Sequence, residues 1–217
     1  MPGLLLQYMS NRDWHTFLDL GCGEGNLLYS ANKRGILKGK GVYAVDISEK
    51  RIEVVRTISP DFSCSVDDAC NLKTIPSNSV DILASAQVIE HVPDDLRMIK
   101  EIARVVRANG YVYLSTVFKR PGAVYIYRNH GKSVIDPTHV REYTSDSELL
   151  GKLTENGFVV EKNVKSQMMR SVIGFTLLSR LGAQRDIIQR NSVVRLLHEL
   201  RFPIPGYFYW EVVARRS

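Results

Sequence analysis

Apolar and polar positions along the chain predict strands and helices in turn. Short apolar runs predict strands at 16–20, 41–46, 62–66, 80–86, 111–117, 158–162 and 207–214. Between them, apolar residues at helical spacing predict helices at 25–33, 48–58, 94–107 and 145–155. Strands that alternate with helices indicate an α/β fold. We expect a mostly parallel seven-stranded sheet, covered by helices on both faces, with a further insertion before the last strand.

A glycine-rich loop follows the first predicted strand. Residues Phe17 to Gly25 read F-L-D-L-G-C-G-E-G, so that glycines alternate at positions 21, 23 and 25 behind an apolar run. The second predicted strand ends at Asp46, 21 residues after the last of these glycines. Glycines allow a sharp turn close to a ligand, and a carboxylate at the next strand end accepts hydrogen bonds from two ribose hydroxyls. The pattern therefore predicts a site for a nucleoside-bearing cofactor.

The glycine spacing distinguishes two classes of such cofactors. A dinucleotide site would have its third glycine at position 26, where the helix must start close to a pyrophosphate. Position 26 is Asn. Asp19, just before the loop, is badly placed for a diphosphate but well placed to bind the ammonium group of an amino acid. We therefore expect a nucleoside that carries an amino acid. The alternative for Asp19 is that it only caps the loop.

Further motifs agree, and together they resemble the class I S-adenosylmethionine-dependent methyltransferases. Asp67-Asp68-Ala69 is similar to the family's third cofactor motif, and residues 79–92 to its fourth strand and the turn beside the transferred methyl. Residues 107–116 are similar to its turn into strand five, although Asn109 replaces a usual proline. The resemblance covers about residues 15–162. It implies a Rossmann-like fold, S-adenosyl-L-methionine as the cofactor and methyl transfer as the activity.

The resemblance also implies cofactor-binding roles at four strand ends. The methionine part would lie against the glycine loop, and the ribose and the adenine face against the end of the second strand. The adenine edge would meet the third motif, and the methyl group would lie beside the turn after the fourth strand. In that order, the residues implied are Asp19, Gly21, Cys22, Gly23 and Gly25; Asp46 and Ile47; Asp68 and Ala69; and Ala86 and Gln87.

Two titratable residues, Glu90 and His91, follow the fourth predicted strand. Methyl transfer needs a nucleophile placed in line with the carbon–sulfur bond and, for many acceptors, a group that takes a proton. A histidine can do so near neutral pH. We therefore predict Glu90 and His91 as candidate catalytic residues, together with His139 from T-H-V-R-E-Y. The alternative is structural: His91 could cap the helix that begins near Asp94, with Glu90 facing solvent.

The segment from Gln87 to Val92 also resembles the E-V-x-E-H-V segment of ubiquinone-pathway O-methyltransferases and of small-RNA 2′-O-methyltransferases. The latter use acids and histidines to hold a divalent metal against the nucleophilic hydroxyls, and His139 could supply an additional histidine. Position 87 is Gln in this chain, which lowers the ligand charge and weakens the binding of a hard cation. We therefore predict no metal ligands.

Length and composition narrow the class of protein. The 217 residues, 44% of them hydrophobic, suit one α/β domain, and we expect a single domain over residues 1–217. No run approaches the roughly 20 apolar residues of a membrane-spanning helix, and residues 1–10 lack the pattern of an export signal. Three cysteines without C-x-x-C spacing favour a reducing cytoplasm, and we predict none of them as a nucleophile.

Two segments are predicted to cover the substrate. Residues 118–143 follow the fifth strand and are rich in aromatic and titratable side chains. Residues 165–205 precede the last strand and carry five excess positive charges between Lys165 and Phe202, in a chain of net charge +6. Apolar residues are interleaved with these charges, so we predict two or three basic amphipathic helices. Their use is open: a cap over the substrate, a contact with anionic lipid or RNA phosphates, or a structural cap with solvated arginines.

The leading hypothesis is a cytoplasmic methyltransferase of a small, partly apolar or lipid-like molecule, with an oxygen, carbon or simple amine nucleophile. An amide-nitrogen target is disfavoured, since Ala84-Ser-Ala-Gln87 stands where such enzymes have N/D-P-P-Y. An RNA methyltransferase is one alternative, although the sequence shows no appended RNA-binding module. A cofactor-binding regulatory protein without catalysis is another. The oligomeric state stays open.

Overall fold

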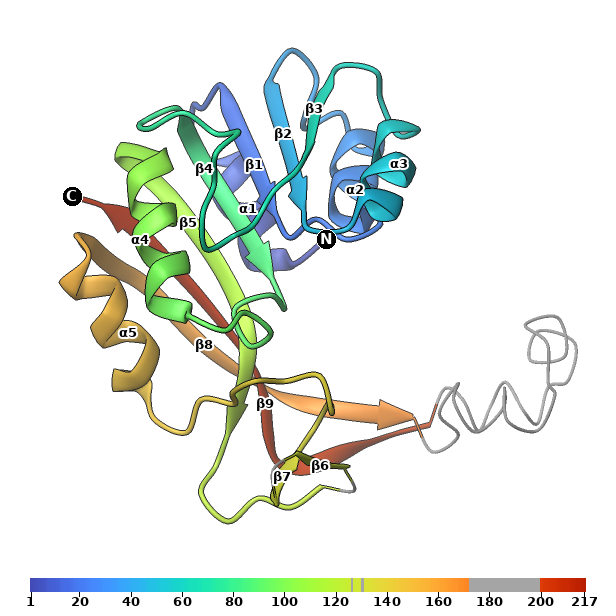
Figure 1. Cartoon of the computed structure of the whole chain (residues 1–217), viewed down its shortest axis with the longest axis vertical. Helices are drawn as coiled ribbons and strands as arrows, with labels where there is room; N and C mark the ends of the chain where they lie inside the picture. Colours follow the sequence, from blue (N-terminus) through green and yellow to red (C-terminus); the bar gives the residue numbers. More distant parts are fainter. Residues whose placement is uncertain (126, 130, 172–199) are drawn as a thin grey trace, which may run out of the picture.

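A computed structural model describes residues 1–125, 127–129, 131–171 and 200–217. Its main element is a seven-stranded sheet of order β3-β2-β1-β4-β5-β9-β8 (Figure 1). The first five strands in this order pair in parallel, and β9 is antiparallel to both of its neighbours. The predicted mostly parallel sheet is therefore confirmed. The seven strands are β1 (Thr16–Leu20), β2 (Gly41–Asp46), β3 (Phe62–Val66), β4 (Val80–Ala86), β5 (Val106–Lys119), β8 (Phe158–Ser171) and β9 (Arg201–Arg216).

Helices cover both faces of the sheet, as predicted. On one face, α1 (Gly3–Ser10), α2 (Asn26–Lys33) and α3 (Glu49–Arg56) bury apolar side chains in one core cluster. On the other face, α4 (Asp95–Val105) and α5 (Asp146–Glu155) build a second cluster. Figure 1 shows α4 and α5 side by side, away from α2 and α3. Burial of these apolar faces is what holds the layers together.

Some elements differ from the prediction. Helix α1 was not expected; it forms because Leu5, Tyr8 and Met9 bury one face of it. Helix α4 ends at Val105 rather than at 107, and the chain enters β5 directly, with Asn109 in the left-handed conformation (φ 61°). Within the predicted cap segment 118–143, a short hairpin pairs β6 (Tyr127–Asn129) with β7 (Lys132–Val134).

The predicted helical insertion is wrong at both of its ends. Residues 165–171 belong to β8 and residues 201–205 to β9, and the two strands pair as far as Ser171 and Arg201. They form a ribbon that extends past the end of the sheet (Figure 1). The segment pairs with β9 through its main chain, and most of its side chains are exposed, so its sequence lacks the alternating apolar pattern that would have predicted a strand. The predicted amphipathic helices fall mainly on residues 172–199, outside the described residues.

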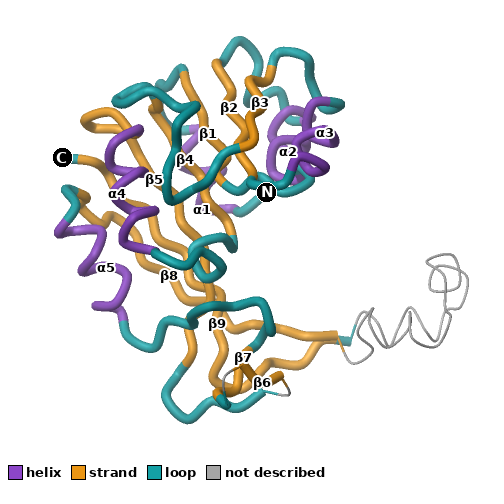
Figure 2. Tube along the Cα trace, viewed as in Figure 1, coloured by secondary structure: helices purple, strands orange, loops and turns teal. Residues whose placement is uncertain are grey.

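The sheet places the predicted site residues at one edge. Asp19 is in register with Ala44 of β2 and with Ala84 of β4, so the carboxyl ends of these parallel strands lie together. Ligands of open α/β sheets bind in the crevice beyond such ends. Figure 2 shows loops gathered at this edge, between the sheet and the β6–β7 hairpin. Among the described helices, none has the length and apolarity needed to cross a bilayer.

Candidate active site

A cavity of about 580 Å³ lies at the carboxyl ends of β1, β2 and β4. Its volume is in the range of sites for drug-sized molecules, roughly 300–1,000 Å³. Six of the predicted cofactor-binding residues line it, together with His91 from the predicted catalytic set. The lining comprises Leu20, Gly21, Val45, Asp46, Ile47, Arg51, Asp67, Asp68, Ala69, Gln87, Val88, His91, Val92, Pro93 and Thr138.

The glycine loop turns back against the second strand. Gly21, Gly23 and Gly25 all have positive φ, a conformation that costs little only for glycine. The backbone N–H groups of Gly21 and Cys22 both donate to the carbonyl of Val45, which fixes the loop to β2. A Cβ at Gly21 would lie 2.4 Å from a methyl carbon of Val88, whereas one at Gly23 would meet no atom within 4 Å. The loop is therefore held closely on one side and has open space at its centre.

Asp46 connects the loop to the second strand end. Its carboxylate accepts hydrogen bonds from the N–H groups of Gly23 and Ser48, each at 2.9 Å, and the Arg51 guanidinium lies 3.6 Å away. The side chain is buried but lines the cavity. Each carboxylate oxygen has more than one lone pair, so both retain acceptor capacity for hydroxyl donors. This arrangement suits the two hydroxyls of a ribose.

Asp19 is a buried carboxyl with an unsatisfied atom. It is 3% exposed, and its Oδ2 has no hydrogen-bond partner among the described residues. Burial, together with the negative charge of Asp46, raises the pKa of Asp19 to about 7. A buried polar atom without a partner costs free energy, and an ammonium group placed beside it would satisfy it. Asp19 therefore fits the amino-acid end of S-adenosylmethionine, and within the described part of the chain no side-chain hydrogen bond supports the capping alternative.

The two acids of the third motif, Asp67 and Asp68, have different surroundings. Asp67 accepts hydrogen bonds from Lys73 N, Thr74 N and the Thr74 hydroxyl, so it holds the turn that follows β3. Burial would raise the pKa of Asp67, but these bonds outweigh it and lower the pKa. Asp68 is exposed and uses Oδ1 to accept from Cys70 N. Ile47 is 74% exposed on the cavity wall, which leaves its side chain available to an aromatic ring.

The turn after β4 brings the two halves of the site together. Ala86 ends the strand, and Gln87 follows with φ 57°, uncommon for a residue other than glycine. In the orientation that satisfies its amide, Gln87 donates to Glu90 Oε1 and accepts from Thr116 N, both at 3.2 Å. The Thr116 hydroxyl donates to Glu90 Oε2 at 3.0 Å. Gln87 thus supports Glu90 as well as lining the cavity.

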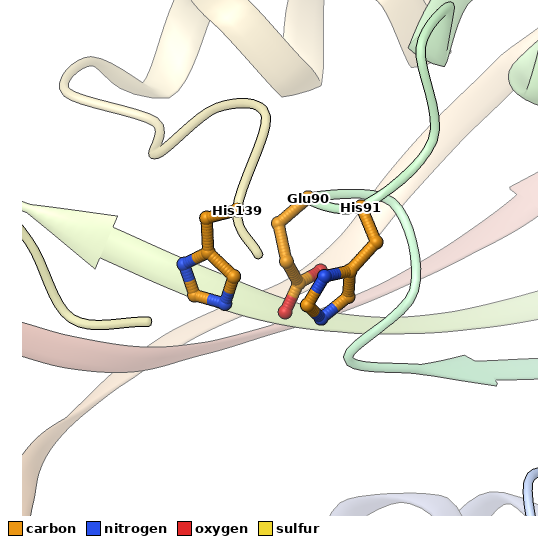
Figure 3. A group of neighbouring side chains, drawn as sticks. All are labelled: Glu90, His91 and His139. Carbon is orange, nitrogen blue, oxygen red and sulfur yellow. The ribbon is translucent and has the colours of Figure 1, made fainter. Parts of the chain in front are cut away.

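Glu90, His91 and His139 come together, as the catalytic prediction required. Figure 3 shows the Glu90 carboxylate between the two imidazole rings. Ring centroids of His91 and His139 are 4.9 Å apart, and Glu90 is fully buried. Burial raises the pKa of Glu90, although the hydrogen bond from Thr116 and the two imidazoles oppose the shift. The structural alternative is wrong for both residues: Asp94 caps α4 by accepting from Arg97 N, and Glu90 does not face solvent.

A segment that we call the strap, residues 136–142, holds the turn after β4 in place. The N–H groups of Val140 and Arg141 donate to the carbonyl of Glu90. The Arg141 guanidinium donates to three more carbonyls of the same turn, at 2.6–2.8 Å. Those carbonyls belong to Ile89, Val92 and Pro93. The strap is therefore fixed to the candidate catalytic residues through the main chain.

The same three side chains offer the ligand types of a metal site. Their ligand atoms lie within 4.8 Å of one another. This spacing is close to the separation of about 4.2 Å at most between two ligands bonded to one ion at about 2.1 Å. Outside this group of side chains, burial raises the pKa of Cys22, Cys64 and Cys70, which keeps these thiols protonated and poor nucleophiles.

A second cavity, of about 430 Å³, lies on the other side of the strap. His139 and Glu142 line it, together with three basic residues at the end of β5 and in the strap: Lys119, Arg120 and Arg141. His91 and Thr138 line the first cavity and His139 lines the second. The wall between the two cavities therefore contains the histidine pair.

Several site residues were missed by the sequence analysis. Arg51 lies about one helical turn after the predicted Ile47, and Val88 directly follows the predicted Gln87. Their closeness to these positions was the only hint in the sequence that they belong to the site. Arg141 acts through contacts with residues about 50 positions away in the sequence, for which the sequence carries no signal, and Glu142 contacts the nearby His139 as well as Lys119. Conversely, five predicted cofactor-binding residues do not line the cavity: Asp19, Cys22, Gly23, Gly25 and Ala86.

Known proteins match this arrangement. Residues 18–114 match the methyltransferase domain family. A probable S-adenosylmethionine-dependent methyltransferase of Mycobacterium tuberculosis is 34% identical over 142 residues, 65% of this chain and 48% of the relative. A ubiquinone biosynthesis O-methyltransferase of Xanthomonas campestris pv. campestris is 31% identical over 150 residues, 61% of each chain. The chain thus spans about half to three fifths of the length of these relatives.

A solved structure supports the fold. The geranyl diphosphate C-methyltransferase of Streptomyces coelicolor, in complex with Mg²⁺, geranyl diphosphate and S-adenosyl-L-homocysteine, has a TM-score of 0.65 and 15% identity. The match covers 99% of this chain and 76% of that one. The recognised resemblance is thereby confirmed. Residues 18–114 match the methyltransferase domain family, and the chain has the fold of the class I S-adenosylmethionine-dependent methyltransferases.

Proposed function

We propose that the protein transfers a methyl group from S-adenosylmethionine to a small, partly apolar molecule with an oxygen, carbon or simple amine nucleophile. The observation that carries this proposal is the first cavity. It runs from the ribose-compatible Asp46 to His91, and its lining includes Gly21, two residues after the unsatisfied carboxyl of Asp19. The relatives named for S-adenosylmethionine-dependent and ubiquinone O-methylation support it.

The residues of the chain would divide the work between binding and proton transfer. When bound, the cofactor supplies an already activated methyl group, so the protein need not generate an electrophile. Asp19 and Asp46 fix the two polar ends, which sets the direction of the carbon–sulfur bond. The acceptor's nucleophilic oxygen, nitrogen or carbon bonds to the methyl carbon, and the electron pair of the broken carbon–sulfur bond stays on sulfur. For a hydroxyl or amine acceptor, an imidazole of the histidine pair takes the proton.

The size of the cavities supports a small acceptor. Both volumes, about 580 and 430 Å³, suit small molecules. Val88, Val92 and Pro93 give the first cavity an apolar end beside His91, which favours an acceptor with an apolar part.

The test is methyl transfer from cofactor labelled in its methyl group. The protein is incubated with panels of phenols, carboxylic acids, isoprenoid alcohols and amines, and separately with total RNA. We expect label in an extractable small molecule and little in RNA. Label in RNA alone would replace the proposal with RNA methylation. Binding of the cofactor without transfer to any panel would favour a regulatory protein.

A further inference from the structure

The second cavity, of about 430 Å³, has an excess of positive charge in its lining. Of the described residues that line it, three are cations and one is a carboxylate: Lys119, Arg120 and Arg141 against Glu142. A concave site lined mainly by one sign of charge concentrates ligands of the opposite sign. The low dielectric of its walls strengthens each such contact. The charge of this cavity therefore favours an anionic ligand.

Two of the three cations already have partners in the protein. The Arg141 guanidinium donates to three carbonyls of the turn after β4, and its Nε lies 3.6 Å from Asp95. The Lys119 ammonium donates to the carbonyl of Ser133. It also lies 3.7 Å from Glu142 Oε2, an ion pair too long for a hydrogen bond. Because an ammonium has three donors, Lys119 keeps hydrogen-bonding capacity for a ligand, whereas Arg141 keeps little.

Arg120 is the cation of this cavity whose donors are open to a ligand. Its side chain is exposed, and no carboxylate of the described residues lies within ion-pair distance of it. Its guanidinium lies over the ring of Phe208, 4.9 Å from the ring centre, and such a contact uses no conventional hydrogen bond. The main chain at Arg120 is fixed as well, because its N–H donates to Gly206 O and its carbonyl accepts from Ala123 N. A guanidinium held in this way can bind a carboxylate or a phosphate through two parallel hydrogen bonds.

The carboxylate of Glu142 limits where in the cavity an anion can lie. The Glu142 side chain is 3% exposed, the Lys119 side chain is 16% exposed, and Arg120 is exposed. The negative charge therefore lies at the inner end of the cavity, and the open positive charge lies at its mouth. Since like charges repel, an anionic group fits at the mouth, against Arg120 and Lys119, and the uncharged part of the ligand points inward.

We propose that the second cavity binds a small anionic group, a carboxylate or a phosphate, through Arg120 and Lys119, and that this group belongs to the methyl acceptor. His139 lines the same cavity, so the inner end of a ligand anchored at Arg120 lies toward the candidate catalytic residues. Apolar residues that suit the uncharged part of such an acceptor complete the lining: Pro121, Val134 and Val140. The assignment of the anion to the acceptor rests on the proposed function, whereas anion binding itself does not.

Anion binding is tested by titrating the ¹⁵N-labelled protein with benzoate, and separately with inorganic phosphate, at constant ionic strength. We expect the amide signals of lining residues such as Gly122 and Val140 to shift. Arg120→Gln should weaken binding about tenfold or more, the effect of one lost hydrogen bond between charged groups. Arg34→Gln, which removes the same charge at an exposed position after α2, is the control and should bind normally. Lining signals that do not move, or equal affinities in Arg120→Gln and the control, would overturn the proposal.

Methyl transfer then shows whether the anion belongs to the acceptor. Each acid that accepts a labelled methyl group is compared with its primary amide. We expect a lower KM for the acid, and Arg120→Gln should raise the KM of the acid about tenfold without raising that of the amide. Equal KM values for acid and amide, or transfer to neutral compounds alone, would overturn the assignment to the acceptor and make the anion a separate ligand. No transfer to any compound would contradict the proposed function as well, while the titration would still decide anion binding.

Discussion

The cofactor end and the acceptor end of the site are built in different ways. The cofactor end is made by the backbone at strand ends: three glycines with positive φ, and Asp46 bonded to two N–H groups. The acceptor end is made by side chains that meet across the sequence, on a turn held by Arg141. The cofactor end should therefore tolerate almost no change in backbone geometry, whereas the acceptor end depends on individual side-chain hydrogen bonds.

The largest effect is expected from Asp46→Ala. The substitution removes the acceptor of two backbone N–H groups and of the ribose hydroxyls. Hydrogen bonds to charged groups contribute roughly 1.5–3 kcal/mol each, so the affinity for S-adenosylhomocysteine should fall at least about 100-fold. Titration calorimetry measures this. Asp61→Ala, at an exposed position before β3, is the control and should bind normally; equal affinities would disprove the role of Asp46.

The second-largest effect is a loss of folding stability in Gly21→Ala, with Gly39→Ala as the control. Both glycines have similar φ, 75° and 72°, but only at Gly21 would a Cβ clash, at 2.4 Å from Val88. The left-handed conformation costs roughly 1–2 kcal/mol for alanine, and overpacking adds roughly 1–3 kcal/mol. Urea unfolding should therefore show Gly21→Ala as the less stable variant. Equal free energies of unfolding would mean that the close contact with Val88 is absent.

These two predictions concern the part of the site that the sequence revealed. Alternating glycines and an acid at the next strand end are local patterns, because neighbouring residues of the chain build that end of the cavity. The acceptor end could be predicted only as far as Glu90, His91 and His139. Arg141 lies 48 residues from Pro93, whose carbonyl it binds, and Glu142 is one polar residue in a segment without periodicity. Likewise, β8 was predicted too short because its exposed side chains follow no apolar alternation.

A smaller effect is expected from Arg141→Gln at the acceptor end. The substitution takes the donor from three carbonyls of the turn after β4. Two of these carbonyls belong to the buried residues Ile89 and Val92, and a buried acceptor that loses its donor costs about 1–3 kcal/mol, so we expect a loss of about 2 kcal/mol in the free energy of unfolding. Urea unfolding measures it, with Arg34→Gln, exposed after α2, as the control. If both variants unfold alike, the guanidinium does not hold the turn.

The smallest effect is a pH dependence of cofactor binding. Burial and Asp46 raise the pKa of Asp19 to about 7, so the carboxyl is largely protonated below that pH. An ammonium ligand needs the carboxylate, and the proton must therefore leave on binding. Affinity for S-adenosylhomocysteine should be constant above pH 7 and fall about tenfold for each pH unit below it. In Asp19→Asn this slope should vanish. A slope that survives the substitution would assign the titration to another group.

The most direct test of the whole account is a crystal structure of the protein with S-adenosylhomocysteine. The account predicts the amino group beside Asp19, the ribose hydroxyls on Asp46, and the sulfur at the end of the cavity that faces His91 and Glu90. An empty cavity in crystals grown with saturating ligand, or a ligand bound with its ribose away from Asp46, would contradict it.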